Sequence, residues 1–425
     1  MASFTAGDNR RDLLLFAALG VLLLAVFMSQ GTAYALRVTV EALCYALIAF
    51  GLSLQWGTAG LFNVGIMGFI AAGAFASMFI SYPVNGAFWA SDGPSLIGDI
   101  AVKIVIGAGL VFAVSRSGKL GLPKGLVTFL TLVTLAIAYL VVSQSLDPAA
   151  RYIESEAGFV GGLGLPVYIG WGFAGVVAGA IAWVVGKICL GLRSDYLAIA
   201  TLGIAQIIKT FLKNADWLTR GTQTVSPLPW PLPTASEIGF TAARSGYLVM
   251  TAVMLVIVYL LLQRAYGAPW GRMMRAIRDN EDAAAAMGKD VNRRRLQIFV
   301  FGCVLMGIGG AALIHFNTIF DPNGFLDLNH TFLIWVMVIL GGPGNNRGAI
   351  FGALLVYIIW TMSEPVTLYI FDHIRTIGQS FGWQPPADLD SRALSMRVFV
   401  IGLTITLVLR FAPKGLMPER LSRKG

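Results

Sequence analysis

Long apolar segments alternate with short polar ones along the chain, and each apolar segment is hydrophobic on all sides rather than on one helical face. A helix needs roughly 20 apolar residues to cross the hydrocarbon core of a bilayer. The pattern therefore predicts an all-α fold, a polytopic membrane bundle. Barrel strands are not expected, because they would appear as short alternating segments. The expected spans are approximately residues 12–28, 38–55, 61–81, 98–115, 125–146, 167–190, 196–212, 246–264, 295–316, 331–342, 348–370 and 396–412.

Two of these spans, 196–212 and 331–342, are short, so we expect between ten and twelve membrane helices. Lysine and arginine gather in alternate connections, on the side that includes both chain ends. Cytoplasmic loops of membrane proteins carry such an excess of basic residues. Both termini are therefore expected in the cytoplasm. The opposite loops, where most acidic residues lie, are about 82–97, 147–166, 213–245, 317–330 and 371–394.

Composition supports lipid as the main solvent of the chain. Hydrophobic residues make up 56% of the sequence and charged residues 12%, whereas a soluble domain carries about 25% charged residues. The formal net charge of +9 does not indicate a nucleic-acid partner, because no basic segment is interleaved with aromatic residues. The loop bias explains this charge better. We expect no nucleic acid among the partners.

The sequence shows no chemistry typical of an enzyme, a metal site or a nucleotide site. The three cysteines, Cys44, Cys189 and Cys303, lie in apolar runs without disulfide or zinc spacing and are expected to be buried. No phosphate-binding loop of the G-x-x-x-x-G-K-[ST] type occurs. We therefore expect no cofactor bound by this chain and no catalytic residues. If the protein pumps, the energy should come from a partner.

The N-terminal segment has two interpretations. Arg10 and Arg11, the apolar run 13–28 and a small-residue sequence at 33–35 together resemble a signal peptide. The run is at the upper length limit for such a peptide, and the rest of the chain enters the membrane anyway. We therefore favour a retained first helix.

Two glycine-rich stretches interrupt the apolar pattern, at 51–65 and 341–348. Broken helices inside a membrane are tolerated only where they line a cavity or are buried in protein, and they often mark a substrate path. For the second stretch we prefer a turn at the membrane surface, since its asparagines and arginine look solvated. For the first, a position beside the substrate path and a tight surface turn are equally supported. The residues assigned to this hypothetical path are Gln55, Asn63, Gly60 and Gly65.

Two further features receive a structural interpretation. Glu41 follows Arg37 by four residues near the start of a span, and we interpret them as an ion pair on one helical face. The glycines at 170, 172, 175 and 179 have the small-residue spacing of helix packing.

A polar segment at 265–295 separates two expected spans and contains a short predicted helix. Asn280 is a suitable N-cap, Glu281 and Asp282 fall in the first turn, and Gly288 is a natural stop. Such a helix has too little apolar surface to be stable alone in water. It is well shaped to dock into a groove of another protein. A connector without a partner is the alternative.

At this helix the chain resembles a known family. The segment Asp282-Ala283-Ala284-x-x-x-Gly288, with Ile298 following, is similar to the coupling-loop signature of ABC importer permeases, although aspartate replaces the usual glutamate and Val300-Phe301 replaces Leu-Pro. The wider sequence resembles the LivM-type permeases of branched-chain amino acid importers. The stretches that carry this likeness are 51–65, 192–203, 269–288 and 340–344, and 80–160 carries none.

The resemblance implies a set of partners and roles. A second, homologous permease subunit, two ATPase subunits that use ATP and a periplasmic substrate-binding protein would complete the importer. The residues that would couple to the ATPase are Glu281, Asp282, Ala283, Ala284 and Gly288. The expected location is the bacterial inner membrane, and the expected cargo is a branched-chain or similar amino acid. Urea or a short amide is the alternative cargo, and a self-contained secondary transporter or channel is the alternative class.

These interpretations divide the chain into three parts. Residues 1–36 form an N-terminal tail and first helix, residues 37–412 form the permease domain with its coupling loop at 265–295, and residues 413–425 form a basic cytoplasmic tail.

Overall fold

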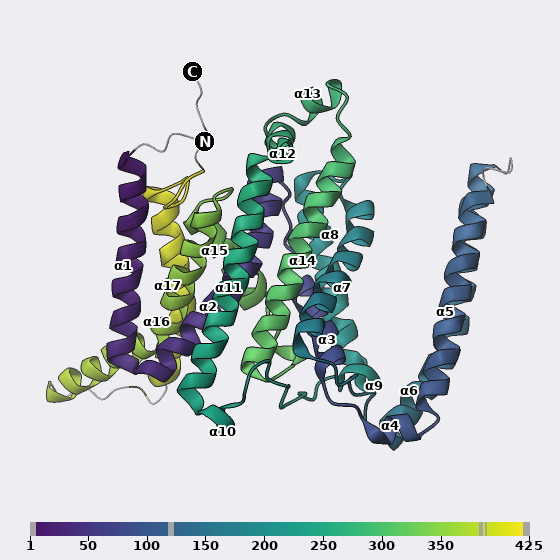
Figure 1. The fold of residues 1–425 in the computed structure, drawn as a ribbon, viewed down its shortest axis with the longest axis horizontal. Helices are drawn as coiled ribbons and strands as arrows, with labels where there is room; N and C mark the ends of the chain where they lie inside the picture. Colours follow the sequence, from purple (N-terminus) through teal and green to yellow (C-terminus); the bar gives the residue numbers. More distant parts are fainter. Residues whose placement is uncertain (1–5, 118–122, 382–385, 387–388, 420–425) are drawn as a thin grey trace.

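The computed structural model describes residues 6–117, 123–381, 386 and 389–419, which form helices and no β-strand (Figure 1). The helices are α1 (Ala6–Gln30), α2 (Thr32–Leu52), α3 (Ile66–Ser81), α4 (Gly86–Ala90), α5 (Gly93–Arg116), α6 (Lys124–Glu156), α7 (Val167–Cys189), α8 (Ser194–Asn214), α9 (Asp216–Thr219), α10 (Ala235–Ile238), α11 (Phe240–Gly267), α12 (Pro269–Asp279), α13 (Glu281–Ala286), α14 (Val291–Asn317), α15 (Leu333–Gly341), α16 (Asn346–Ser380) and α17 (Leu389–Phe411). Two π-helical segments, Ser53–Thr58 and Leu328–Phe332, and a 3₁₀ turn at Pro322–Gly324 complete them.

Ten helices in the described part of the chain are long and apolar enough to cross a membrane. The all-α membrane bundle is thereby confirmed, at the lower end of the expected ten to twelve spans. The short segment at 196–212 belongs to a full-length helix, α8. The segments expected at 61–81 and 331–342 instead form shorter apolar helices, Ile66–Ser81 and Leu328–Gly341. Both are short because each adjoins one of the two glycine-rich breaks.

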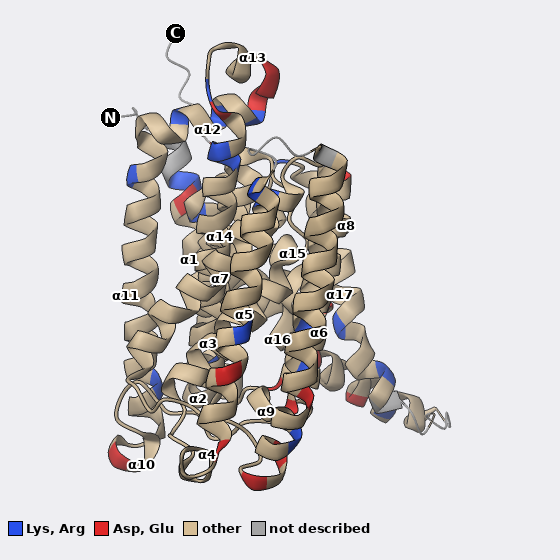
Figure 2. Cartoon of the chain, turned by 90° about the vertical axis from the view of Figure 1, so that its right-hand side faces the viewer, with Lys and Arg blue, Asp and Glu red and all other residues tan. Residues whose placement is uncertain are grey.

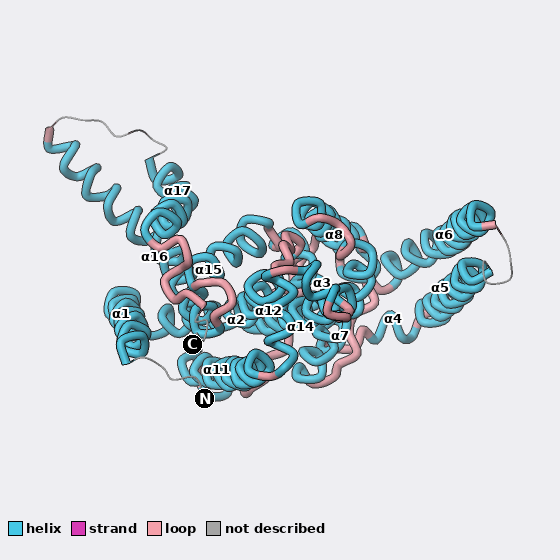
Figure 3. The backbone as a smooth tube through the Cα atoms, turned by 90° about the horizontal axis from the view of Figure 1, so that it is seen from above, coloured by secondary structure: helices cyan, strands magenta, loops and turns pink. Residues whose placement is uncertain are grey.

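The bundle is built around α2, whose second half is fully buried. Helix α14 packs against α2, α3 and α7, and α11 and α16 cover other sides of α2. Helices α1, α16 and α17 form one flank of the molecule, while α5 and α6 pack on each other and stand apart on the opposite flank (Figures 1 and 3). The three cysteines are buried and free, as expected.

The bundle has two distinct ends. Helices α12 and α13 project at one end, where α1 begins and α17 finishes, and we call it the α13 end (Figure 1). The short helices α4, α9 and α10 lie at the opposite end, which we call the α10 end. Basic residues gather on α12 and around the α13 end (Figure 2). Acidic residues are prominent at the α10 end, although α13 is acidic too.

Glycines allow the central helices to approach closely. A Cβ at Gly73 would lie 2.4 Å from Gly307 Cα, so α3 and α14 touch there through their backbones. Three of the four glycines singled out on α7 also lie at helix contacts, against Ser77, Val304 or Ile308, whereas Gly172 has open space around it. The packing role expected for this spacing is therefore confirmed for three positions and is wrong for Gly172, because that residue faces away from the neighbouring helices.

Candidate functional site

The first glycine-rich stretch is a helix break inside the bundle. Helix α2 continues into the π-helical segment Ser53–Thr58, and the chain then runs without helix from Gly60 to Gly65, directly before α3. Gly60 has a φ of +67°, a left-handed conformation that suits glycine. A Cβ at Gly65 would lie 2.3 Å from the Thr201 carbonyl oxygen on α8. Both glycines are therefore required by the path of the backbone.

The side chains of Gln55 and Asn63 brace this break from within. Gln55 Nε2 donates to the Phe299 carbonyl at 2.8 Å, and Asn63 Nδ2 donates to Gln55 Oε1 at 2.9 Å. Asn63 Oδ1 accepts from the Gly65 amide at 2.9 Å. Both side chains are fully buried within this chain. In this conformation they stabilise the shape of the break and are not exposed to solvent.

Apart from Gly60, the outer surface of the break is formed by residues that the sequence did not single out. Along 60–65, Gly60 and Phe62 are exposed while Leu61, Asn63 and Gly65 are buried, as expected for an extended segment. Phe62 lies 4.4 Å from Trp335, between ring centroids. Trp56 also contacts Trp335, at 4.8 Å. This surface is apolar and aromatic.

The second break, between α15 and α16, is covered rather than solvated. Asn346 is buried, and a segment at 412–419 after α17 packs over residues 340–345. The amides of Leu416 and Met417 donate to the carbonyls of Leu340 and Gly341 at 2.8 and 3.0 Å. The expected turn is present at 343–344, but the solvation expected for Asn346 is wrong, since that residue is buried and the C-terminal segment supplies hydrogen bonds to this region in place of water.

Helix α13 has the predicted caps. Asn280 Oδ1 accepts from the Ala283 amide at 3.0 Å, and Gly288 has a φ of +75°. Arg295 on α14 holds the base of the helix through two 2.9 Å contacts to Glu281. Ala284 is the one residue of α13 that is buried, 8% exposed. Its side chain faces the chain itself.

The face of this helix that remains open is small and partly apolar. Ala283 and Gly288 are exposed, as is Asp282. Met287 exposes 78% of its surface. Sequence reasoning did not select Met287, although an apolar side chain directly before a stop glycine is a detectable signal. The open face is defined by Ala283, Met287 and Gly288.

A cleft of about 430 Å³ lies between α2, α16 and α17, towards the α10 end. Arg37 pairs with Glu41 at 3.3 Å, which confirms the expected ion pair, and Tyr357 Oη donates to the same carboxylate. Across the cleft Arg397 pairs with Glu364. Charged groups within membrane helices are costly unless they are paired or hydrated, and they commonly mark a substrate path. The cleft therefore presents two cationic and two anionic groups inside the span region.

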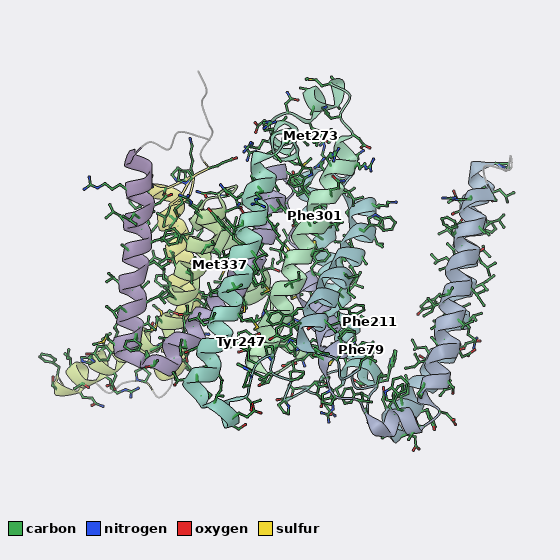
Figure 4. The ribbon with its side chains drawn as sticks, viewed as in Figure 1. Phe79, Phe211, Tyr247, Met273, Phe301 and Met337 are labelled. Carbon is green, nitrogen blue, oxygen red and sulfur yellow. The ribbon has the colours of Figure 1, made fainter. Side chains whose placement is uncertain are left out.

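A larger cleft, of about 800 Å³, opens beside it at the α10 end. Its lining includes Arg37, Trp230, Arg244 and Phe316, so Arg37 borders both clefts. Figure 4 shows Tyr247 near this end of α11, where its ring contacts Trp230 and Phe316 and its hydroxyl donates to the Ala312 carbonyl at 2.6 Å. Aromatic rings and arginines thus lead from the α10 end into the charged cleft.

The family comparison decides what kind of protein carries this arrangement. The profile described as the permease component of branched-chain amino acid transport systems matches residues 100–409, most of the chain. The chain belongs to this permease family. The members that it resembles are transport permeases by name, and not enzymes.

Individual relatives agree with this assignment. The permease is 26% identical over 252 residues to the probable branched-chain amino acid transport permease protein LivM of Methanocaldococcus jannaschii, which covers 58% of this chain and 67% of the relative. It is 29% identical over 217 residues to the high-affinity LivM protein of Escherichia coli K12, covering 45% and 51%. The fructose import permease protein FrcC of Rhizobium meliloti is 28% identical over 188 residues, covering 40% and 51%. For the latter two, the match spans about half of the relative. No solved structure gave a significant match.

Proposed function

We propose that this permease is the membrane-spanning subunit of an ABC importer for branched-chain or similar apolar amino acids. The observation that carries the proposal is α13, a capped helix of six residues that projects between two membrane spans. Its base is tied to α14, yet its open face of Ala283, Met287 and Gly288 has no partner within the described chain that would justify a projecting helix. Small side chains around one exposed methionine suit insertion into a groove of a separate ATPase subunit.

The same proposal orients the protein in the membrane. The α13 end would be cytoplasmic, in agreement with the basic residues gathered there and with the positive-inside rule. The larger cleft at the α10 end would then face the periplasm and receive substrate from a binding protein. A second, homologous permease subunit would complete the path. The membrane would be the bacterial inner membrane.

The charged cleft favours an amino acid as cargo. An α-amino acid carries a carboxylate and an ammonium group, and the cleft offers partly exposed arginine and glutamate side chains, Arg37, Glu364 and Arg397, within one space. The apolar lining at Trp360, Pro365 and Leu368 suits an aliphatic side chain. The aromatic surface of the first break, at Trp56 and Phe62 packed on the buried ring of Trp335, would border the path further in.

A sugar is the competing cargo. Permeases named for fructose and xylose are among the similar proteins, at 26–28% identity. A neutral sugar carries hydroxyl groups and no charge, so it cannot form ion pairs with the arginine and glutamate side chains of the cleft, whereas an amino acid can. The charges therefore support the amino acid, and a direct comparison of leucine, xylose and urea uptake distinguishes the three cargoes.

Co-purification with the ATPase subunits tests the coupling role of α13. Gly288→Arg and Met287→Glu place a charge on the open face, where an unpaired charge buried in a contact is unfavourable. Gly191→Arg is the matched control, because Gly191 in the α7–α8 turn is also exposed with open space around it. We expect ATPase subunits to be lost from the first two variants and retained by the control. Retention in all three variants would contradict the proposal.

A further inference from the structure

We propose that Arg278 is a positioning residue that connects the coupling helix α13 to both helix breaks. It contacts the first break directly and reaches the second through Glu419 in the C-terminal segment 412–419, and we call this set of contacts the junction. This inference rests on the proposed function, since it concerns how motion at α13 would reach the membrane path. It gives a role to Arg278 and Glu419, two side chains that the sequence did not single out.

Arg278 lies at the end of α12, next to the residues that cap α13. One of its guanidinium nitrogens, Nη1, donates to the Gly57 carbonyl in the π-helical segment and to Glu419 Oε2, the latter at 2.7 Å. Its Nε contacts Asp279 at 3.2 Å. The side chains of Arg278 and Glu419 are each 21% exposed. A charge pair so little exposed is less weakened by solvent than a surface pair.

The neighbouring residue of the same break is held by the end of α11, three residues before α12 begins. Thr58 Oγ1 donates to Tyr266 Oη at 2.7 Å. Gly57 and Thr58 are therefore held from the last turn of α12 and from the last turn of α11. A rotation of α12 and α13 as one body would pull directly on the π-helical segment.

The two breaks touch each other at this same point. A Cβ at Gly57 would lie 2.1 Å from the Gly344 amide nitrogen, so only glycine permits this approach. Gly344 in turn lies beside Glu419, because a Cβ there would be 3.2 Å from the Glu419 carboxylate. Movement of one break cannot leave the other in place without opening this contact.

The C-terminal segment closes the junction. Asn345 Nδ2 donates to the Met417 carbonyl at 2.9 Å, and a Cβ at Gly342 would lie 2.3 Å from the same oxygen. Together with the backbone bonds of Leu416 and Met417 described above, these contacts fasten 412–419 to the second break. Glu419 then reaches across to Arg278. The end of α12, both breaks and the segment after α17 thus share one set of hydrogen bonds, and α13 follows α12 directly in the chain. Contiguous networks of this kind can carry energetic coupling between distant sites.

The experiment compares Arg278→Ala, Glu419→Gln and the matched control Arg272→Ala in the complete importer. Arg272 lies on the same helix but is exposed, and within the described part of the chain its side chain hydrogen-bonds to the Gly267 carbonyl alone. The measured quantity is the ATP hydrolysed per leucine imported, in proteoliposomes containing the ATPase subunits and binding protein. Loss of one coupling interaction should raise this ratio by about fivefold, the low end of the range for energetic coupling between two sites. We expect that increase for Arg278→Ala and a smaller one for Glu419→Gln, with the ATPase subunits still bound.

A charge-exchange variant separates the two contacts of Arg278. Arg278→Glu combined with Glu419→Arg restores an ion pair between these two positions, but a glutamate at position 278 cannot donate to the Gly57 carbonyl. We therefore expect ATP hydrolysis and uptake to remain uncoupled in this variant. Equal ratios for Arg278→Ala and Arg272→Ala would overturn the inference. Loss of the ATPase subunits from Arg278→Ala, or a chain too unstable to purify, would also overturn it, because the role would then be structural. Failure of the unmodified importer to couple ATP to uptake would instead contradict the proposed function itself.

Discussion

The buried amides at the first break give a prediction that separates bracing from substrate contact. Gln55→Leu removes the donor to Phe299 and the acceptor of Asn63, and Asn63→Leu removes the same shared bond together with the one to the Gly65 amide. Leucine is close in volume to glutamine, so the change at residue 55 is mainly one of hydrogen bonding. At residue 63 leucine keeps the branched outline of asparagine, and its larger methyl groups add crowding to the loss of the hydrogen bonds. Both side chains are fully buried, which leaves the abandoned partners without water.

The expected loss of unfolding free energy follows from the number of hydrogen bonds that each variant removes. Hydrogen bonds between membrane helices contribute about 0.6 kcal/mol on average and about 1.7 kcal/mol at most, and an abandoned buried partner adds its desolvation cost. Each single variant should therefore lower the free energy of unfolding by about 1–3 kcal/mol. The double variant should lower it by about 1 kcal/mol less than the sum, because the shared bond is lost only once.

The assay is unfolding of the purified permease in mixed micelles by titration with sodium dodecyl sulfate. Phe62→Ala is the control, since Phe62 is exposed and lies outside this network. It should change the free energy of unfolding by less than about 0.5 kcal/mol, while lowering leucine uptake if the aromatic surface borders the path. If the losses of unfolding free energy of the two single variants add up to that of the double variant within about 0.3 kcal/mol, the two amides are independent. That result would refute the bracing role.

Three further predictions follow from packing, charge and orientation. Gly170→Leu should destabilise the bundle by more than about 1 kcal/mol, whereas Gly172→Leu should be tolerated; equal melting curves would contradict the helix contacts. Glu364→Gln should raise the leucine concentration for half-maximal uptake about tenfold, a loss of ~1.4 kcal/mol, and an unchanged value would remove the charged cleft from the path. Reporter fusions after Gly425 should give a cytoplasmic signal and fusions within 213–245 a periplasmic one, and the reverse pattern would invert the proposed topology.

Periodic and local features of this protein could be predicted from the sequence. The span positions follow from apolar length, and the caps of α13 follow from Asn280 and Gly288, because these signals lie within a few residues of their effect. The positions of both breaks follow from their glycines. The ion pair of Arg37 and Glu41 follows from helical spacing alone.

The contacts that join distant segments could not be predicted in this way. Arg278 and Glu419 are 141 residues apart, and no local pattern brings them together. The contact of Gly57 with Gly344 depends on how the two breaks pack against each other, and no periodic pattern in the sequence indicates that packing. Ala284 faces inward because Arg295 fixes the rotation of a helix too short to show an apolar stripe. The path assigned to Gln55 and Asn63 stays a prediction, with both side chains buried in this conformation.

Uptake by reconstituted proteoliposomes tests the central claim most directly. The permease is inserted alone, or together with its homologous partner subunit, the ATPase subunits and the binding protein, and radiolabelled leucine is supplied outside the vesicles. Accumulation of leucine against its gradient only when all components and ATP are present is the result expected. Equilibration of leucine by the permease alone, without ATPase subunits or ATP, would contradict the account and favour a self-contained channel or secondary transporter.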